Sequence, residues 1–270
     1  MLQRAISSTN ELIPAIGLGT WKVFDVDPAQ EHPELLQVLH QFHKAGATVI
    51  DSSPMYGNAE EITGQLTQAS GIADKFFYAT KVWIQGRQEG IRQMEASMRK
   101  MQRSTVELMQ IHNLVDWQIH LETLREWKAA GKIKYIGITH YTDSMHAELE
   151  KIISTEPIDF VQFNYSIHAR AAEKRLLPAA AEHGVATLIN RPFGEGALFS
   201  KVRGKQLPEW VKEYNIHSWA QLFLKFILSH PAVTCVIPAT SKVSNAIDNL
   251  QAGQGEMPDA GARQKLAALF

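Results

Sequence analysis

Four side chains that can handle protons stand at or just past the ends of strand-like runs: Asp51, Tyr56, Lys81 and His112. Asp51 ends a β-branched run, and Tyr56 follows it in a turn punctuated by Pro and Gly. Lys81 and His112 end the next two apolar runs along the chain. Where parallel strands form a closed ring, their carboxyl ends share one face, and chemistry takes place there. We therefore predict that the four side chains converge.

These residue types suit the delivery of a proton to a carbonyl group. A tyrosine with its ordinary pKa of about 10 needs its anion stabilised before it can act as an acid at neutral pH. An ammonium such as Lys81 stabilises the phenolate, and a carboxylate such as Asp51 keeps that ammonium charged. His112 can orient the carbonyl as a hydrogen-bond donor. None of the four supplies hydride, so the set implies a nicotinamide cofactor.

Each residue also has a simpler explanation when it is taken alone. Asp51 could cap a helix, and Lys81 could be a surface charge; their combination on successive strands is what favours catalysis. Cys235 lies in an apolar run and is expected to be a small buried hydrophobe. No HxH or HExxH spacing occurs, so we predict no metal site.

Strand-like runs alternate with amphipathic helical segments along the whole chain. Strands are expected at 15–20, 49–51, 76–80, 106–111, 135–140, 160–164, 185–190 and 234–237. Helices are expected at 33–46, 59–68, 87–101, 121–131, 144–153, 173–183, 219–228, 243–250 and 258–270. The alternative, an open doubly wound sheet, would carry GxGxxG after its first strand, and 17–20 lacks the third glycine. We therefore predict one α/β domain over 1–270, a (β/α)8 TIM barrel.

Composition limits the classes of partner and compartment. The 270 residues are 45% hydrophobic and 20% charged, with a formal net charge of -1, which gives no reason to expect nucleic acid or an anionic membrane. The one cysteine excludes an intramolecular disulfide. Residues 1–10 lack the apolar segment of a signal peptide, and no apolar run reaches membrane-spanning length. We expect a cytoplasmic protein, either a monomer or a weak dimer.

Two segments could hold a cofactor. The stretch 191–217 is longer than an ordinary loop between strand and helix, and it begins with the turn-rich sequence 191–196. Thr240 or Ser241 could cap the helix at 243–250, whose N-terminus would attract phosphate. An ordinary helix cap fits that second sequence equally well.

The chain resembles the aldo-keto reductase superfamily. The resemblance is carried by residues 17–21, 51–57 with 60–61, 79–81, 108–113, 137–139, 162–165 and 237–241, in the family's order and spacing. It implies a (β/α)8 barrel that binds NAD(P)H across its C-terminal face. In that arrangement Tyr56 is the general acid, Lys81 and Asp51 tune it, and His112 orients the carbonyl.

The resemblance also implies which residues meet the cofactor. Those expected at the cofactor are Gly19, Thr20, Asp51, Thr139, His140, Gln162, Asn190, Arg191, Pro192, Phe193, Gly194, Ala239, Thr240, Ser241, Lys242, Asn245 and Asn249. The carboxamide is expected at Thr139, His140 and Gln162. Trp21, Met55, Trp83 and Trp117, together with Phe24, fall in loops or strand tips near this site and could form an apolar substrate wall. For any one of the tryptophans, partly buried packing explains the sequence equally well.

Three departures from the family pattern shape these expectations. Asn190 stands where many members place an aromatic ring against the nicotinamide, and Phe193 is a candidate replacement. Ala239 and Asn245 replace basic residues that NADP-preferring relatives use, although Lys242 gives a slight preference for NADP(H) over NAD(H). The long C-terminal loop of steroid-binding members is missing, which predicts an open pocket for small or varied carbonyl substrates.

We interpret the protein as an NAD(P)H-dependent oxidoreductase that reduces aldehyde and ketone carbonyls, with a small molecule as its partner. The alternative is a nicotinamide-binding regulatory barrel that senses redox state and turns over little. A third class, a metal-dependent hydrolase, is disfavoured by the absent ligand clusters.

Overall fold

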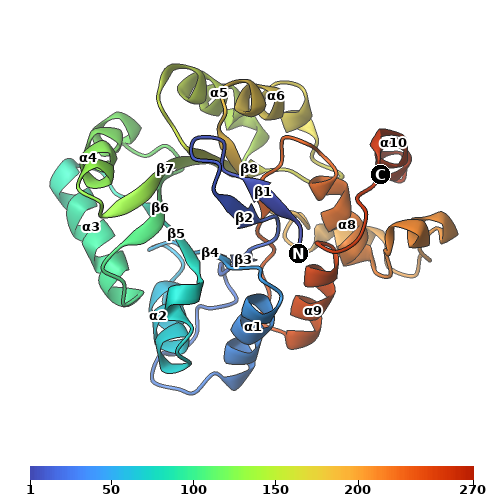
Figure 1. Cartoon of the computed structure of the whole chain (residues 1–270), viewed down its shortest axis with the longest axis horizontal. Coiled ribbons are helices and arrows are strands. Elements are labelled where there is room, and N and C mark those ends of the chain that lie inside the picture. The colour runs from blue at the N-terminus through green and yellow to red at the C-terminus, as the bar shows by residue number, and fades with distance from the viewer.

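The computed structural model describes residues 1–270, and a ring of eight parallel strands stands at its centre (Figure 1). The strands pair in chain order: β3 (Leu18–Gly19), β4 (Val49–Asp51), β5 (Phe77–Val82), β6 (Val106–His112), β7 (Ile133–Thr139), β8 (Phe160–Asn164), β9 (Ala186–Asn190) and β10 (Cys235–Val236). Parallel bridges join Ile16 to Val236 and Gly19 to Ala239, so the first and last strands close the ring. The predicted (β/α)8 barrel is confirmed.

Helices surround the ring on its outside (Figure 1). They are α1 (Pro33–Lys44), α2 (Ala59–Ala69), α3 (Arg87–Lys100), α4 (Trp117–Ala129), α5 (His146–Thr155), α6 (Leu176–Glu182), α7 (Ala197–Lys201), α8 (Trp219–Leu228), α9 (Val243–Gln251) and α10 (Ala260–Ala267). In α1, Pro33 occupies the start, where its missing N–H costs nothing, and the side chains buried against the strands recur at helical spacing. The expected methionine face of α3 is core packing, with Met94 and Met98 buried.

The sequence did not predict α7, which lies within the stretch expected as a long loop, nor an N-terminal hairpin of β1 (Gln3–Ala5) and β2 (Leu12–Pro14). Its strands are three residues long, too short for an alternating pattern to be recognised. In Figure 1 the hairpin lies over the middle of the ring. Ile6 and Ile13 are buried in one cluster with residues from inside the barrel, among them Phe77, Tyr135 and Phe160. The hairpin therefore closes the N-terminal mouth of the barrel.

Strand register brings the carboxyl ends together at the other mouth. Asp51 pairs with Gly19 on one side and with Ala79 on the other. Thr139 pairs with His112 and with Gln162, and the ends of β8 and β9 lie side by side in the same way. The polar residues that end the strands thus share one face, as predicted.

The predicted helix boundaries needed two corrections. The helix expected from 173 is divided into a 3-10 turn, Ala171–Glu173, and the short α6. Pro178 lies in the first turn of α6, where it has no N–H to bond to the carbonyl of Lys174, so a helix start is favoured there over a continuous helix. The helix expected at 121–131 begins earlier, at Trp117.

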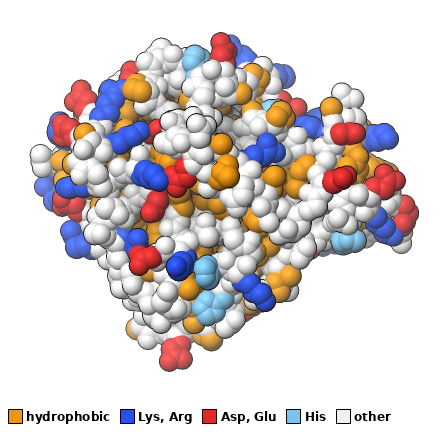
Figure 2. All heavy atoms as spheres, viewed as in Figure 1, with side chains coloured by type: hydrophobic (Ala, Val, Ile, Leu, Met, Phe, Trp, Pro, Cys, Tyr) orange, Lys and Arg blue, Asp and Glu red, His pale blue; other side chains and the backbone are white.

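No helix in the structure has the length and apolar character needed to cross a bilayer. Acidic and basic side chains are interspersed on the face shown in Figure 2.

Candidate active site

The turn after β4 carries two of the four predicted residues. Asp51 ends the strand, and Tyr56 follows in a turn where its amide donates to the Ser53 carbonyl (3.0 Å). Gly57 adopts a φ of 59°, and a Cβ there would lie 2.0 Å from a carboxylate oxygen of Asp25. That same oxygen accepts a hydrogen bond from the Asn58 amide (3.0 Å). The glycine and Asp25 together fix the direction in which Tyr56 leaves the turn.

Lys81 on β5 is completely buried between the carboxylate and the phenol. Its Nζ donates to Asp51 Oδ2 at 2.7 Å and to the Ser52 carbonyl at 2.6 Å, and it lies 4.9 Å from the centroid of the Tyr56 ring. Burial alone would lower the pKa of Lys81, but the carboxylate and the phenol outweigh it, so this pKa lies above its usual value. Burial raises the pKa of Tyr56, and the Lys81 charge acts in the opposite direction. The phenol therefore keeps its proton at neutral pH beside a permanent positive charge.

Gln110 on β6 belongs to the same cluster, and the sequence interpretation missed it. Its Nε2 donates to Asp51 Oδ1 (3.0 Å), and the same oxygen accepts from Gln162 Nε2 (2.9 Å). A Cβ on Gly137 of β7 would lie 2.8 Å from Gln110 Cγ, so the glycine makes room for the glutamine inside the barrel. The Asp51 carboxylate is thus held by one ammonium and two amides.

His112 ends β6 beside the phenol. Its ring centroid is 5.9 Å from that of Tyr56, at an interplanar angle of 83°, and 6.4 Å from that of Trp83. Burial, and secondarily the Lys81 charge, lowers the pKa of His112 to about 2. The imidazole is consequently neutral, and its Nδ1 lies 3.0 Å from the Ser53 hydroxyl. The structure brings all four predicted residues to one mouth of the barrel.

The residues expected to form a substrate wall divide into three groups. Trp21, Met55 and Trp83 are 37%, 39% and 42% exposed, so their side chains are open to contact with a ligand. Trp117 begins α4 and packs, partly buried, against the core. The expectation for Phe24 was wrong, because this ring is fully buried and cannot meet a substrate.

The residues expected at the carboxamide form a connected set. Gln162 Oε1 accepts from Thr139 Oγ1 and from Asn190 Nδ2, each at 3.3 Å. Asn190 Nδ2 also approaches the His140 carbonyl (3.4 Å), while Asn190 Oδ1 is buried without any partner. The strand ends thus bring together the side chains of Thr139, Gln162 and Asn190, and Asn190 Oδ1 is left without a hydrogen-bond donor.

The residues near Gly19 and the start of the long loop are already engaged with the protein. The Gly19 amide donates to the Pro238 carbonyl, and Thr20 Oγ1 lies 3.0 Å from both the Asp51 carbonyl and Ser52 Oγ. Arg191 pairs with Glu195 (2.8 Å) and donates to the Tyr141 carbonyl (3.2 Å). Pro192 is buried, and Gly194 turns the chain with a φ of 55°.

A groove of about 420 Å³ runs between the long loop and α9. It is lined by ten residues: Phe193, Phe199, Ser218, Trp219, Ala220, Ala239, Thr240, Asn245, Asp248 and Asn249. Five of these were expected at the cofactor. The other five were missed: Phe199 on α7, Ser218, Trp219 and Ala220 at the start of α8, and Asp248 on α9 itself. Asp248 is already bonded to Ser218 Oγ and Gln221 Nε2, both at 2.7 Å.

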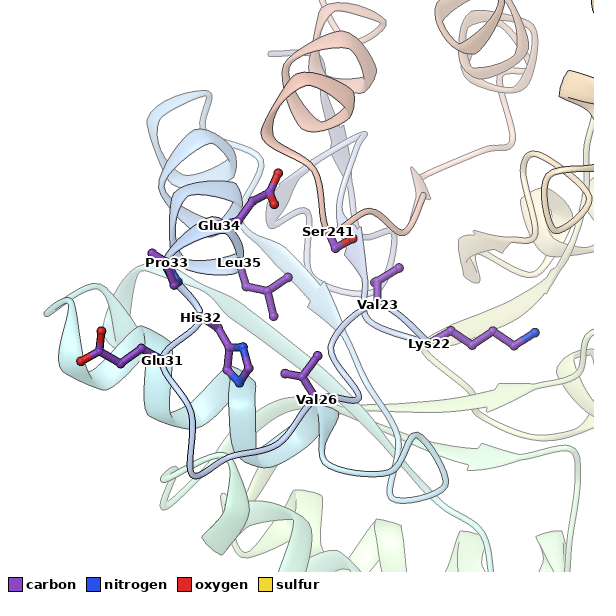
Figure 3. A pocket seen from close by; sticks show the side chains of 9 residues that line it. All are labelled: Lys22, Val23, Val26, Glu31, His32, Pro33, Glu34, Leu35 and Ser241. Atoms are coloured by element: carbon purple, nitrogen blue, oxygen red, sulfur yellow. The ribbon is translucent and has the colours of Figure 1, made fainter.

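The cap predicted for α9 was wrong. The N-cap residue is Lys242, and no side chain caps the helix. Thr240 Oγ1 instead accepts from the Lys242 amide at 3.1 Å, which forms a local turn before the helix. Ser241 lines a separate hollow of about 400 Å³ against the start of α1 (Figure 3), with Val23, Val26, His32, Leu35 and four other residues.

Comparisons with known proteins agree with this architecture. The sequence model of the aldo/keto reductase family matches residues 15–264. The methylglyoxal reductase YeaE of Escherichia coli (strain K12) is 25% identical over 269 residues, which cover 96% of this chain and 93% of that protein. The aldo-keto reductase YhdN of Bacillus subtilis (strain 168) is 25% identical over 214 residues, covering 73% of this chain and 64% of that protein.

Solved structures give the same result for the fold. An aldo/keto reductase from Klebsiella pneumoniae, in complex with NADP and acetate, superposes with a TM-score of 0.85 at 23% identity, covering 100% of this chain and 96% of that one. The thermostable aldo-keto reductase Tm1743, in complex with the inhibitor epalrestat, has a TM-score of 0.81 at 26% identity, with both chains covered completely. Because the family model spans most of the sequence, the chain belongs to the aldo/keto reductase family.

Proposed function

We propose that this protein reduces aldehyde or ketone carbonyls to alcohols, with hydride from NAD(P)H and a proton from Tyr56. The observation that carries the proposal is the cluster of Tyr56, Lys81, Asp51 and His112 at the open mouth of the barrel. Membership of an oxidoreductase family supports the class of reaction. The cluster supplies what a carbonyl needs while it accepts hydride, namely a proton and a donor that holds its oxygen.

Each residue has one task in the proposed reaction. Tyr56 gives its proton to the carbonyl oxygen, and the developing phenolate is stabilised by the Lys81 ammonium. Two of the three Lys81 protons already bind Asp51 and Ser52, which leaves one for the phenol. His112, being neutral, donates to the carbonyl oxygen and orients it. The nicotinamide, when bound, supplies the hydride.

Two observations support a nicotinamide cofactor at this face. Asn190 Oδ1 is buried and unpartnered beside Gln162, where an amide N–H of the cofactor's carboxamide would satisfy it. The groove between Phe193, Trp219 and α9 offers aromatic surface together with the Asn245 and Asn249 amides, which suits an adenosine. Gly19, Thr20, Thr139, His140 and the segment 191–194 would line the path between them.

The proposed preference for NADP(H) over NAD(H) is slight. Lys242 is exposed at the start of α9 and binds no carboxylate, so it is free to meet a phosphate. Arg191 is less available because it already pairs with Glu195. Two related structures, both from Klebsiella pneumoniae, contain NADP and NADPH.

Small carbonyl compounds are the proposed substrates. Trp21, Met55 and Trp83 give the mouth an apolar rim. The relative from Escherichia coli that covers nearly the whole chain is a methylglyoxal reductase, so methylglyoxal is the first compound to test. Simple aliphatic and aromatic aldehydes complete a useful screen.

The experiment is a titration followed by an assay. Quenching of tryptophan fluorescence by NADPH and by NADH would give the two dissociation constants, and we expect both cofactors to bind, NADPH somewhat more tightly. Loss of NADPH absorbance with each carbonyl compound would then measure reduction. Binding without turnover of any carbonyl would favour the regulatory, redox-sensing barrel, and binding of neither cofactor would refute both functions.

A further inference from the structure

Ser53 lies in the turn after β4, between Asp51 and Tyr56 in the sequence. Its hydroxyl contacts the end of β6, two strands away. The Oγ lies 3.0 Å from His112 Nδ1, a contact that joins positions far apart in the sequence. Ser53 is completely buried and His112 is 5% exposed, so water cannot replace this hydrogen bond.

The direction of the hydrogen bond follows from its other partner. Ser53 Oγ accepts from the Met55 amide (3.4 Å), and His112 Nδ1 is its only remaining neighbour within hydrogen-bond distance. If Nδ1 carried the proton, the hydroxyl hydrogen of Ser53 would be buried with no acceptor. If the hydroxyl donates to Nδ1, every group is satisfied. The network therefore assigns the proton of the neutral imidazole to Nε2.

The other imidazole nitrogen faces the mouth of the barrel. His112 Nε2 has no hydrogen-bond partner within the protein. It is also not one of the buried polar atoms without a partner, so it is open to a ligand. A substrate oxygen beside Tyr56 would meet this nitrogen. With its proton on Nε2 the ring can donate to that oxygen, whereas the other tautomer would present a lone pair and repel it.

We propose that Ser53 is a positioning residue for carbonyl reduction: its hydroxyl, by donating to Nδ1, holds His112 in the tautomer that has a hydrogen on Nε2. The inference rests on the proposed function for its catalytic consequence, but the tautomer itself exists in the resting protein. The groups facing the imidazole are the Tyr56 ring, the Trp83 ring and, further away, the Lys81 ammonium and the His140 side chain. None of them accepts from or donates to Nδ1, so Ser53 alone selects the tautomer.

The test compares Ser53→Ala with Ser52→Ala. Both serines are fully buried in the same turn, but the Ser52 hydroxyl bonds to Thr20 and not to the imidazole. Each variant loses one buried hydroxyl and keeps the backbone of the turn. Thermal unfolding followed by circular dichroism would establish that both variants fold.

The decisive readout is the ¹⁵N NMR spectrum of histidine-labelled protein, with the His112 signals assigned by a His112→Asn variant. We expect protonated Nε2 and unprotonated Nδ1 in the wild type and in Ser52→Ala, and loss of that preference in Ser53→Ala. In the assay, kcat of Ser53→Ala should fall about tenfold, as loss of one ordinary hydrogen bond would produce, while the Kd for cofactor stays unchanged.

Two results would overturn the proposal: a wild type protonated on Nδ1, or a Ser53→Ala variant with the wild-type tautomer and kcat. The NMR result requires no turnover, so it is separate from the proposed function. A wild type that shows the Nε2–H tautomer but reduces no carbonyl would refute the proposed function and leave the assignment of the proton intact.

Discussion

The two mouths of the barrel each hold a tyrosine, a lysine and a carboxylate, but the contacts among the three groups differ between the mouths. At the C-terminal mouth the three are Tyr56, Lys81 and Asp51, and the ammonium lies between the other two. At the N-terminal mouth Tyr135 donates directly to Glu11 of the hairpin, which also pairs with Lys134. The residue types are the same, but the order of contact differs.

That order determines what each phenol can do. Burial and the hydrogen bond to Glu11 both raise the pKa of Tyr135, so its environment opposes release of the proton. Burial also raises the pKa of Tyr56, and there the next cause in size is the opposing charge of Lys81; at Tyr135 the opposing charge of Lys134 is a smaller cause than the hydrogen bond to Glu11. The hairpin covers Tyr135, which is fully buried, while Tyr56 stays partly exposed. A phenol next to an ammonium at an open mouth can act as an acid. A phenol that donates to a carboxylate beneath the N-terminal hairpin instead stabilises the fold.

The largest expected effect is that of Tyr56→Phe, with Tyr135→Phe as the matched variant at the N-terminal mouth. Tyr56→Phe should lower kcat for carbonyl reduction by about 10²–10⁴-fold, the usual contribution of a positioned general acid, and leave NADPH binding intact. Tyr135→Phe should stay within about twofold of the wild type, because its hydroxyl touches only Thr9 and Glu11. Steady-state kinetics with one aldehyde would measure both variants. Equal rates for Tyr56→Phe and the wild type would end the assignment of the proton donor.

The two lysines should differ in what they contribute to stability. Lys81→Met leaves the Asp51 carboxylate buried without its ammonium, and this should cost about 3–5 kcal/mol. Lys134→Met removes an ion pair whose side chains are 53% and 35% exposed, and this should cost at most about 1 kcal/mol. Urea unfolding of both variants gives the comparison. If the two variants lose similar free energies of unfolding, the different burial of the two ion pairs does not determine their contribution to stability.

Much of this arrangement could be predicted from the sequence because strands, and the polar residues at their ends, leave local signals. Apolar runs that end in Asp51, Lys81 and His112 indicated both the strands and the face on which their ends meet. The hairpin left no such signal, since its register with the barrel depends on packing by Ile6 and Ile13.

Residues inside the site were harder to find. Gln110 stands within an apolar run, and it points the same way as His112 because residues two apart on a strand share a face. That rule, applied to the strand, could have found it. Ser53 could not have been found, because its contact with His112 depends on how two distant segments meet in space. The sequence indicated Phe193 as a cofactor contact, but it gave no indication that Trp219 shares a groove with it, because that contact also depends on how two distant segments meet.

The smallest effect should come from Gln110→Leu, which tests how much the hydrogen bonds to the Asp51 carboxylate, at the C-terminal mouth, contribute to stability. The variant removes one of the two amides on Asp51 Oδ1, together with the Gln110 Oε1 that accepts from Gln162 Nε2 (3.0 Å), and keeps the bonds of Gln162 and Lys81 to Asp51. Because Gln162 Nε2 still has Asp51 as its acceptor, loss of the hydrogen bond to the charged carboxylate should dominate, at about 1.5–3 kcal/mol in urea unfolding, less than the loss of the ammonium. Gln65→Leu on the outside of α2 is the control: it loses only a bond to Glu61 one turn away, worth about 0.5 kcal/mol or less. If Gln110→Leu proves as harmless as the control, Asp51 is held by Lys81 and Gln162 alone, and the amide pair is not what distinguishes this mouth from the other.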